Sequence, residues 1–339
     1  MNVNRILAAV MLVPFLFSGC ASELTEPQTT SFFAMDTVIS LSVYGEETLL
    51  ADAVRRIAEL EQRFSVTDAE SDIYAVNHCG TAAVSADTAA CLALGLDLCR
   101  RTDGALDFSV YPIVRAWGFT TSDYKIPSQQ ELSALLPLVG YDRIRLDEAN
   151  GTVSLEDGMQ IDLGGIAKGY TGDQLIRLFR ENGVTSALIN LGGNVQTVGT
   201  KPDGTPWRIG VQSPFGEGYL GTIEAKDEAV ITSGGYERYF EKDGQIFWHI
   251  IDPATGLPAK NGLLSVTVAG ESGALCDGLS TALFVMGLEK AAAFWQSSGG
   301  FDAVFVTDDG SVYITEGLAE RFALSHDYAQ ARLTVISYE

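Results

Sequence analysis

The chain has 339 residues, enough for one large domain or two smaller ones. Hydrophobic residues make up 46% of it and charged residues 19%, so its composition excludes an intrinsically disordered chain. Its 44 acidic and 22 basic residues give a formal net charge of −22, and without a basic run that balance excludes a broad nucleic-acid surface or a polybasic membrane patch.

The N-terminus is interpreted as an export signal rather than a folded element. An apolar run over residues 6–17 is too short to span a bilayer and is typical of the core of a signal peptide. It leads to Cys20, which follows two small residues and resembles the lipobox of bacterial lipoproteins. We therefore expect a signal peptide over residues 1–19, lipidation of Cys20 and a polar tether over residues 20–30. The alternative is an ordinary secretory signal with an incidental Cys.

Apolar periodicity in the first half of the mature chain predicts helices around a few strands. Alternating residues predict a strand over 38–44, and an apolar stripe from Leu49 to Phe64 predicts an amphipathic helix over 48–64. Further helices are expected over 87–102, 132–138 and 167–182, with short strands over 143–146, 152–155 and 160–163. Gly183 closes the last of these helices as its C′ residue.

The second half is richer in strands. Because most of these strands follow one another with turn residues between them, we expect an α+β fold with largely antiparallel sheets and packed helices. No interior boundary is evident, so one compact unit over residues 31–339 is expected. The predicted strands are 186–190, 195–198, 207–212, 220–224, 229–232, 238–240, 247–251, 265–269, 303–307 and 312–315, and the predicted helices are 274–286 and 289–297.

Four Cys residues remain after Cys20, namely Cys79, Cys91, Cys99 and Cys276. Their spacing suits no zinc motif. We expect all four to be buried apolar residues, and a disulfide among them stays open because export would permit one.

The common nucleotide-binding and hydrolase motifs do not occur in the sequence. It contains instead several Gly-rich turns flanked by polar residues, which we call corners. In the first corner, residues 161–170, a strand meets two Gly residues and a helix begins with Lys168 in its first turn. A cation there opposes the helix dipole unless an anionic ligand binds beside it. The alternative is a solvated Lys after a tight turn.

Two further corners are weaker signals. In residues 187–194 a buried strand runs into Gly-Gly between two Asn residues, which we interpret as a strand turn. Residues 232–238 form another Gly-rich corner, and they precede His249 on an apolar strand before an Asp-Pro turn. His249 is a candidate base or positioning donor, and the alternative is a His packed in the core.

The last corner carries the best metal signal. Asp277 and Thr281 are four residues apart and share one face of a helix. A carboxylate and a hydroxyl so placed are hard oxygen donors that suit Mg²⁺ or Ca²⁺. The alternative is a helix cap at Asp277. No His/Cys cluster suggests zinc or a redox metal.

Taken in order, these segments resemble the ApbE family, the FAD:protein FMN transferases, also called flavin-trafficking lipoproteins. The resemblance runs from about residue 32 to residue 307. It rests on the stretches D-L-G-G-I-A-K-G-Y, L-G-G-N, T-S-G-x-Y-E-R, H-I-I-D-P-x-T-G and D-G-L-S-T-A. The family fold is α+β and related to the tunnelling fold. This chain departs from the family pattern at Asp36, often Gly, and at Gly235, often Asp or Asn.

The resemblance implies an Mg²⁺-dependent reaction. FAD is cleaved at its pyrophosphate, FMN is attached by a phosphoester to a Thr of an acceptor redox protein, and AMP leaves. The acceptor is membrane-associated or exported, and its motif in the family ends in Ala-Thr after an Asp and small or hydroxyl residues. The enzyme itself would be exported and held at the membrane by its lipid. Alternatives are an Mg²⁺-dependent FAD pyrophosphatase and a non-catalytic flavin-binding lipoprotein.

The resemblance also implies roles for individual residues. Asp277 and Thr281 would hold Mg²⁺ with the carbonyl of Gly165, and Asp277 and His249 would be catalytic. His249 would activate or orient the acceptor hydroxyl, and Tyr74 would form a wall for the isoalloxazine or the adenine. The other residues expected at the FAD site are Met35, Ala105, Leu106, Asp107, Asp162, Lys168 and Ile251.

Overall fold

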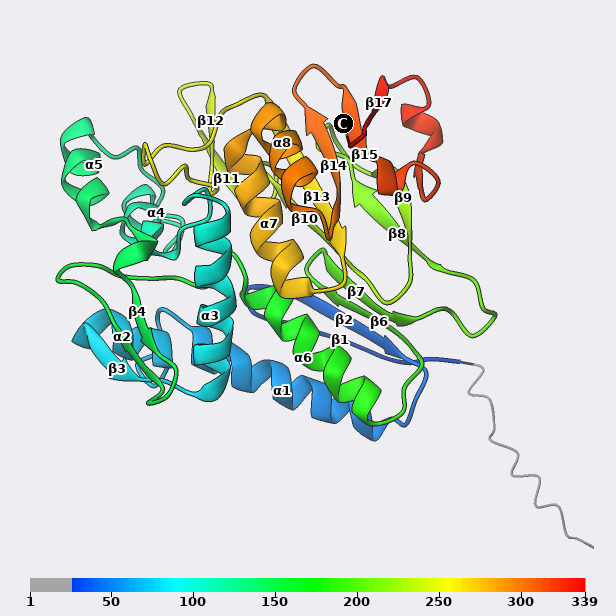
Figure 1. Ribbon diagram of the computed structural model, residues 1–339, viewed down its shortest axis with the longest axis horizontal. Coiled ribbons are helices and arrows are strands. Elements are labelled where there is room, and N and C mark those ends of the chain that lie inside the picture. The colour runs from blue at the N-terminus through cyan, green and yellow to red at the C-terminus, as the bar shows by residue number, and fades with distance from the viewer. Residues whose placement is uncertain (1–25, 339) are drawn as a thin grey trace, which may run out of the picture.

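The computed structural model describes residues 26–338 and centres on a nine-stranded sheet (Figure 1). The expected signal peptide and Cys20 lie outside the described residues. All neighbouring strands of this sheet pair antiparallel except β15 with β17. In sheet order the strands are β1 (Gln28–Ala34), β2 (Thr37–Val43), β6 (Ser186–Leu191), β7 (Asn194–Gly199), β10 (Ala229–Gly234), β13 (Leu263–Gly270), β14 (Asp302–Thr307), β15 (Val312–Thr315) and β17 (Leu333–Ile336).

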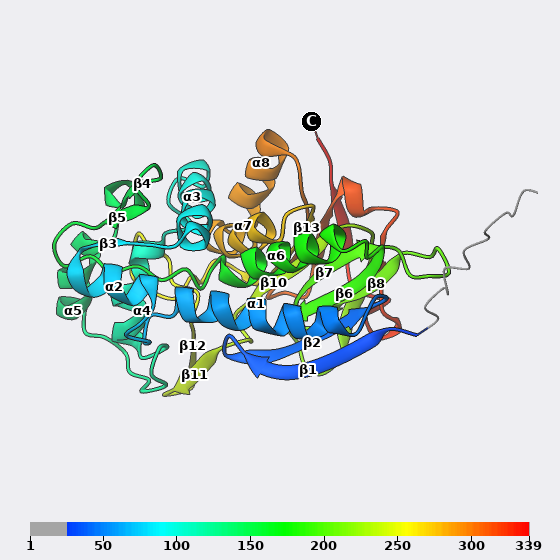
Figure 2. The same cartoon turned by 90° about the horizontal axis from the view of Figure 1, so that it is seen from below.

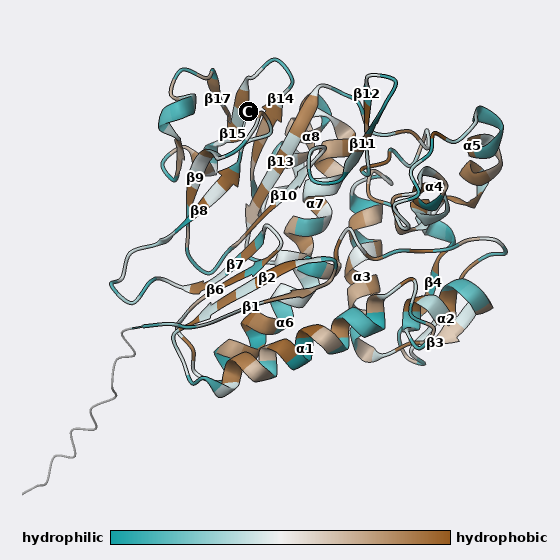
Figure 3. Cartoon of the chain, turned by 180° about the vertical axis from the view of Figure 1, so that it is seen from behind, coloured by the Kyte–Doolittle hydropathy of each residue, from teal (hydrophilic) through white to brown (hydrophobic). Residues whose placement is uncertain are grey.

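Helices cover one face of this sheet. They are α1 (Thr48–Phe64), α6 (Ala167–Glu181), α7 (Gly273–Met286) and α8 (Leu288–Ser298), and α3 (Ala86–Arg101) packs against α7 and α1. Figure 2 shows α1 lying along β1 and β2. In Figure 3, α1 carries both brown and teal segments, the pattern of an amphipathic helix. Its buried stripe includes Ile57, which packs in one cluster with Ile39 of β2 and Leu175 of α6.

The opposite face of the sheet is partly covered by a three-stranded sheet of β8 (Trp207–Gln212), β9 (Tyr219–Ala225) and β16 (Phe322–Leu324). β8 alternates strictly between buried and exposed residues, so its apolar side chains all point one way. They share one buried cluster with Val230 of β10 and Val304 of β14.

A group of short elements lies at one end of the large sheet, at the left of Figure 1. The elements are α2 (Asp72–Cys79), β3 (Thr81–Ala83), α4 (Tyr111–Trp117), α5 (Gln129–Leu135), β4 (Arg145–Asp147), β5 (Thr152–Ser154), β11 (Tyr239–Lys242) and β12 (Gln245–Trp248). Part of the group has an aromatic core, because Trp117, Phe240 and Phe247 pack in one cluster with ring centroids 5.2 to 6.4 Å apart, whereas Ile73 of α2 and Val153 of β5 belong to the main core cluster. No helix among the described residues has the length and apolarity needed to cross a membrane.

The fold confirms the α+β prediction with mostly antiparallel sheets, and the predicted helix over 48–64 and strand over 207–212 have the observed bounds. The strand predicted over 160–163 is wrong. Its Ile161 is held in place by a side chain, since Asn77 Oδ1 accepts the Ile161 N–H at 2.7 Å and Asn77 Nδ2 donates to the Ile161 carbonyl at 2.8 Å. The backbone of Ile161 therefore forms hydrogen bonds with the Asn77 side chain and not with the neighbouring strand that the apolar pattern predicts.

Three other features of the structure differ from the prediction. The tether expected over residues 20–30 overlaps β1, because Gln28 already pairs with Val43. Helix α2 was not predicted; it is short and begins where Ser71 Oγ accepts the N–H of Tyr74 at 2.9 Å. Cys79 is exposed at the end of that helix rather than buried, and all four Cys residues from Cys79 onward are free thiols.

Helices α6 and α7 cross in direct backbone contact. A Cβ added to Gly169 would stand 2.1 Å from the carbonyl oxygen of Gly273, and one added to Gly273 would stand 2.7 Å from the carbonyl oxygen of Gly169. Only two glycines permit this approach. Gln196 of β7 packs against this crossing, and its Nε2 donates a hydrogen bond to the Gly169 carbonyl at 2.9 Å.

Asp173 of α6 then fixes the start of α7. Its Oδ1 accepts the N–H of Gly273 at 2.6 Å, and its Oδ2 accepts the N–H of Ala274 and the hydroxyl of Ser272, both at 3.0 Å. The free N–H groups that every helix leaves at its first turn are thus satisfied by a neighbouring helix. Burial raises the pKa of Asp173, and these three donors oppose that rise.

We expect Gly169→Ala to lower the free energy of unfolding by about 1–3 kcal/mol or more, because the added methyl overpacks two backbones that cannot yield. Urea unfolding followed by circular dichroism measures this. Gly45→Ala is the control, because the atom nearest its added Cβ is a side-chain carbon of Val184 at 3.1 Å, which can shift. Equal stability losses in the two variants would contradict the close crossing.

Candidate functional site

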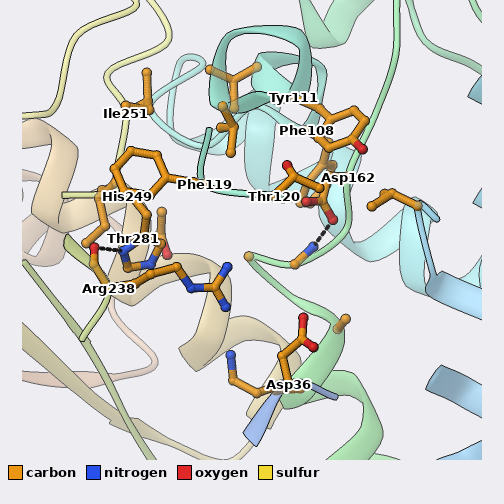
Figure 4. A pocket seen from close by; sticks show the side chains of 18 of the residues that line it. Asp36, Phe108, Tyr111, Phe119, Thr120, Asp162, Arg238, His249, Ile251 and Thr281 are labelled. Carbon is orange, nitrogen blue, oxygen red and sulfur yellow. Dashed lines mark hydrogen bonds between the residues drawn. The ribbon is translucent and has the colours of Figure 1, made fainter. Parts of the chain in front are cut away.

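A cavity of about 750 Å³ opens where the β1–β2 turn, the start of α6, helix α7 and the strand ends after β10 and β12 meet (Figure 4). Its size suits a dinucleotide or a drug-sized ligand. The structure brings nearly all the predicted site residues to this one space. Those that line it are Met35, Ala105, Leu106, Asp107, Asp162, Gly165, Lys168, His249, Ile251, Asp277 and Thr281.

Tyr74 is the exception. It stacks on His78 with ring centroids 3.7 Å apart and lines a smaller neighbouring cavity of about 270 Å³. The two cavities share part of their walls, including Thr67 and Tyr111. Tyr74 therefore lies beside the main cavity and not in its wall, because helix α2 carries it to the far side of that shared wall.

Three oxygen donors, two from α7 and one from the turn before α6, line the cavity. Asp277 is only 5% exposed, and its Oδ2 accepts the N–H of Gly169 at 2.8 Å. The Thr281 hydroxyl lies one helical turn further along α7, at 3.1 Å from Ser233 Oγ. The carbonyl oxygen of Gly165 lies 3.9 Å from the position that a Cβ on Gly278 would take. A carboxylate, a hydroxyl and a carbonyl therefore face one space.

This donor set fits a hard cation. Within residues 26–338 there is no group of three His, Cys, Asp or Glu side chains that could hold a metal ion. A cation bound here would have few protein ligands of mixed oxygen type and would take its remaining ligands from water or a bound phosphate. That arrangement is typical of Mg²⁺ in phosphate-handling sites.

Asp162 organises the turn that precedes α6. Its Oδ1 accepts the N–H of Gly164 at 2.9 Å, and burial raises its pKa, with the charges of Arg238 and Lys168 acting in the opposite direction. Lys168 follows in the first turn of α6 and lines the cavity. The Lys168 ammonium group therefore lines the same space as the cation donors, whereas the N–H groups of Ala167 and Gly169 already donate to the Leu163 carbonyl and to Asp277 Oδ2.

Asp107 braces the wall rather than reaching into the cavity. Its Oδ1 accepts from the N–H and hydroxyl of Ser109 at 2.8 and 2.5 Å, and its Oδ2 accepts from the N–H of Tyr141 at 2.9 Å. Burial raises its pKa, and these donors oppose that rise. Asp107 therefore holds the Ala105–Leu106 backbone against the cavity.

His249 presents a neutral imidazole. Its Nδ1 lies 3.1 Å from the carbonyl oxygen of Arg238, an acceptor, so Nδ1 carries the proton and Nε2 keeps a lone pair. Burial and the charge of Arg238 lower the His249 pKa to about 4. Figure 4 shows the Arg238 side chain extending from beside His249 toward the part of the cavity where Asp36 lies. Near neutral pH His249 is therefore uncharged, with the Nε2 lone pair free.

Glu237 and Asn194 are among the lining residues that the sequence did not assign to the site. Glu237 is open to the cavity but surrounded by protein atoms, and this burial raises its pKa to about 7, aided by Asp277 and opposed by Lys168. Asn194 is 4% exposed, and its Nδ2 has no hydrogen-bond partner among the described residues. Such a donor is unusual, because most buried polar groups have a hydrogen-bond partner. Both residues stood within quoted motifs, but only the tertiary structure turns them inward.

The β1–β2 turn is strained where it meets the cavity. Met35 and Asp36 have φ values of 51° and 58°, the left-handed region that a two-residue hairpin turn requires and that Gly or Asn usually fills. Glu61 of α1 holds the turn, because its Oε1 accepts the N–H of Met35 at 2.7 Å. Asp36 thus combines a backbone conformation that Gly usually adopts with an acidic side chain that faces the cavity in Figure 4.

The cavity is predominantly acidic. Among the described residues its cationic side chains are Lys168 and Arg238. A polyanionic ligand would need further positive charge to bind against this wall. The acidic residues that line it are Asp36, Glu61, Asp107, Asp162, Glu237 and Asp277.

Known proteins are similar to this chain in sequence and in fold. A model of the ApbE family matches residues 35–305. An FAD:protein FMN transferase of Klebsiella pneumoniae is 34% identical over 296 residues, which cover 85% of this chain and 92% of that protein. The crystal structure of the ApbE protein of Thermotoga maritima superposes with a TM-score of 0.81 at 32% identity, covering 86% of this chain and 98% of that one. The apo flavinyl transferase ApbE of Pseudomonas stutzeri gives a TM-score of 0.79 at 29% identity, with 88% and 98% covered.

The two shifted groups predict opposite pH effects on stability. His249 has a folded pKa of about 4 against an ordinary 6.5, so the unfolded chain binds more protons in this window and the contribution of His249 to stability rises with pH. Glu237 has a folded pKa of about 7 against an ordinary 4.5, so its contribution falls as pH rises across that window. We therefore expect His249→Gln to gain stability relative to wild type on acidification, and Glu237→Gln to gain it as pH rises from 4.5 to 7.

Urea unfolding, repeated at pH steps of about half a unit, measures both effects. His326→Gln is the control, because that side chain is fully exposed. Parallel stability curves for all three variants would contradict the two shifts.

Proposed function

The chain belongs to the ApbE family, and on that basis we propose that it is a transferase that moves the FMN part of FAD onto a hydroxyl of an acceptor protein. The curated relatives in this family are FAD:protein FMN transferases. The observation that carries the proposal is the meeting of Asp277, Thr281, Gly165 and Lys168 with a neutral His249 in one cavity.

In this proposal FAD lies in the large cavity with its pyrophosphate near the start of α6. The ammonium group of Lys168 binds phosphate oxygens, and the positive end of the helix dipole favours their negative charge at this place. Met35 and Ile251 contact FAD, while Leu106, held by Asp107, forms part of the wall. The unpaired Nδ2 of Asn194 donates to an oxygen of the ligand.

Mg²⁺ is proposed at the three oxygen donors. Asp277, Thr281 and the Gly165 carbonyl would hold it, and when bound it supplies charge stabilisation at the phosphates during transfer. The acidity of the wall supports this part of the proposal, since Lys168 and Arg238 alone face six acidic residues. The hydrogen bond from Gly169 fixes the Asp277 carboxylate and leaves its other oxygen available.

His249 receives the proton of the attacking hydroxyl. The acceptor oxygen, proposed to belong to a Thr, forms a bond to the FMN phosphorus, the bond from that phosphorus to the bridging oxygen breaks, and AMP leaves. The proton moves to Nε2 of His249, while the Arg238 carbonyl holds Nδ1 and so fixes the ring. With water in place of the acceptor, the same steps give FMN and AMP, which is the pyrophosphatase alternative.

The first test uses Asp277→Asn. The amide can keep the hydrogen bond to Gly169 but loses the charge, so we expect FMN transfer to fall at least about a hundredfold, because metal stabilisation of the phosphates is lost. Intact mass spectrometry measures one FMN mass added to an exported carrier protein that has an Ala-Thr site after an Asp. EDTA should abolish the gain in the wild-type enzyme.

The control for that test is Asp157→Ala, an exposed carboxylate outside the cavity. Free FMN and AMP are followed in parallel. Metal-dependent FMN release without any labelled carrier would favour the pyrophosphatase. FAD that stays bound without turnover would favour a flavin-binding protein.

A second test concerns His249. We expect His249→Gln to lower kcat for transfer by about 10²–10⁴-fold while FAD affinity changes little, because only the proton acceptor is lost. Stopped assays with the same carrier and a fluorescence titration of FAD measure the two quantities. His78→Gln, which removes a ring outside the main cavity, is the control. Normal kcat in His249→Gln would remove this residue from the mechanism.

We also propose that the enzyme is exported and lipid-anchored through Cys20, as the lipobox-like sequence indicates. Incorporation of radiolabelled palmitate in bacteria that express the full chain measures this. We expect label in the wild-type chain and none in Cys20→Ser. Equal labelling of both would contradict the anchor, and no labelling of either would favour an ordinary secretory signal.

A further inference from the structure

Strand β1 is a free edge of the large sheet. It is the first strand in the sheet order, and among the described residues it pairs only with β2. The opposite edge, β17, has four residues, whereas β1 has seven. Long free edges expose unpaired N–H and C=O groups and can recruit a strand from another chain.

The usual protections of such an edge are missing from β1. Its sequence Q-T-T-S-F-F-A contains no charged residue and no Pro, and its register with β2 runs without a bulge from Gln28 to Ala34. Proteins generally blunt edges with these devices. Their absence is unusual in a chain of net charge −22, and it leaves an uncharged, regular strand ready to pair.

The register identifies the backbone groups that point outward. Ala34 and Thr37 flank a two-residue turn, so they form a hydrogen-bonded pair, and such pairs alternate along the hairpin. The N–H and C=O groups of Thr29, Ser31 and Phe33 therefore point away from β2. The side chains of these three residues are also the exposed ones of the strand.

This edge leads directly into the catalytic cavity. Phe33, Met35 and Asp36 line the cavity, and they lie at the end of β1 and in the turn after it. Phe33 is 71% exposed and pairs across the hairpin with Val38, which is 62% exposed. Figure 2 shows α1 on the other face of β1 and β2, so the face with this apolar pair stays uncovered by helices.

We propose that β1 is the docking strand for the acceptor protein, whose hydroxyl-bearing segment binds in extended form as an added strand and runs toward the Met35–Asp36 turn. The inference rests on the proposed function, which requires a polypeptide substrate at this cavity. Backbone groups on β1 provide most of the binding, and the Phe33–Val38 pair packs against one side chain of the added strand. Recognition through the backbone admits different acceptor sequences around the modified residue.

The test is Ser31→Pro. Proline removes the outward N–H of Ser31 and leaves the ladder to β2 in place, which a free edge tolerates. We expect KM for the carrier protein to rise at least about fivefold, because a backbone hydrogen bond to the carrier is lost. The affinity for FAD and the kcat at saturating carrier should stay unchanged, because Ser31 does not line the cavity.

Two controls separate the amide from the side chain. Ser31→Thr keeps the N–H and the hydroxyl, and Ser40→Ala removes only the 2.8 Å hydrogen bond between the Ser31 and Ser40 hydroxyls. Both should have wild-type KM values. An unchanged KM in Ser31→Pro, with normal labelling, overturns the docking inference and leaves the proposed function intact. A wild-type enzyme that labels no carrier overturns both.

A second measurement keeps the inference testable if Ser31→Pro does not fold. Amide hydrogen exchange, resolved by residue, is measured in the wild-type enzyme with and without a carrier whose acceptor Thr is replaced by Val. We expect Thr29, Ser31 and Phe33 to slow only when the carrier is present. No slowing overturns the inference. Protection without the carrier also overturns it and indicates pairing with a second copy if dilution removes the protection, or with this chain's own N-terminal segment if it does not.

Discussion

The site depends on the contact between the backbones of α6 and α7. Gly169 and Gly273 allow the two helices to cross without side chains between them, and Gln196 and Asp173 satisfy the polar groups that the crossing buries. At this crossing the N–H of Gly169 binds the carboxylate of Asp277. The start of one helix and the acidic face of the other are therefore held together, and the proposed phosphate and cation positions become neighbours.

Charge sets the second constraint. The cavity is lined by more acidic than basic side chains, although its proposed substrate is an anion. Burial raises the pKa values of Asp107, Asp162 and Glu237, so it disfavours their charged forms. Lys168, Arg238 and the proposed cation would offset the remaining negative charge. The same surroundings keep His249 neutral, which is the state that a proton acceptor needs.

The two proposed substrates approach from different parts of the fold. FAD would occupy a cavity built by helix starts and strand ends, whereas the acceptor protein would extend the sheet at β1. These regions meet at the strained Met35–Asp36 turn, which Glu61 holds from α1. The strained turn, held by Glu61, would therefore lie between a small-molecule site and a polypeptide site.

Patterns in the amino-acid sequence were enough to predict the location of several helices and strands and the identity of most of the predicted site residues. Apolar periodicity located α1 and β8 to the residue, because a helix stripe and a strand alternation are local properties of the chain. The family resemblance named eleven residues that line the cavity, and seven of them stand in the motifs that carry the resemblance. Which residues share a space depends instead on packing between segments far apart in the chain. That packing places Tyr74 outside the main cavity and pairs the Ile161 backbone with the Asn77 side chain rather than with a strand. It also places Glu237 and Asn194 in the cavity wall.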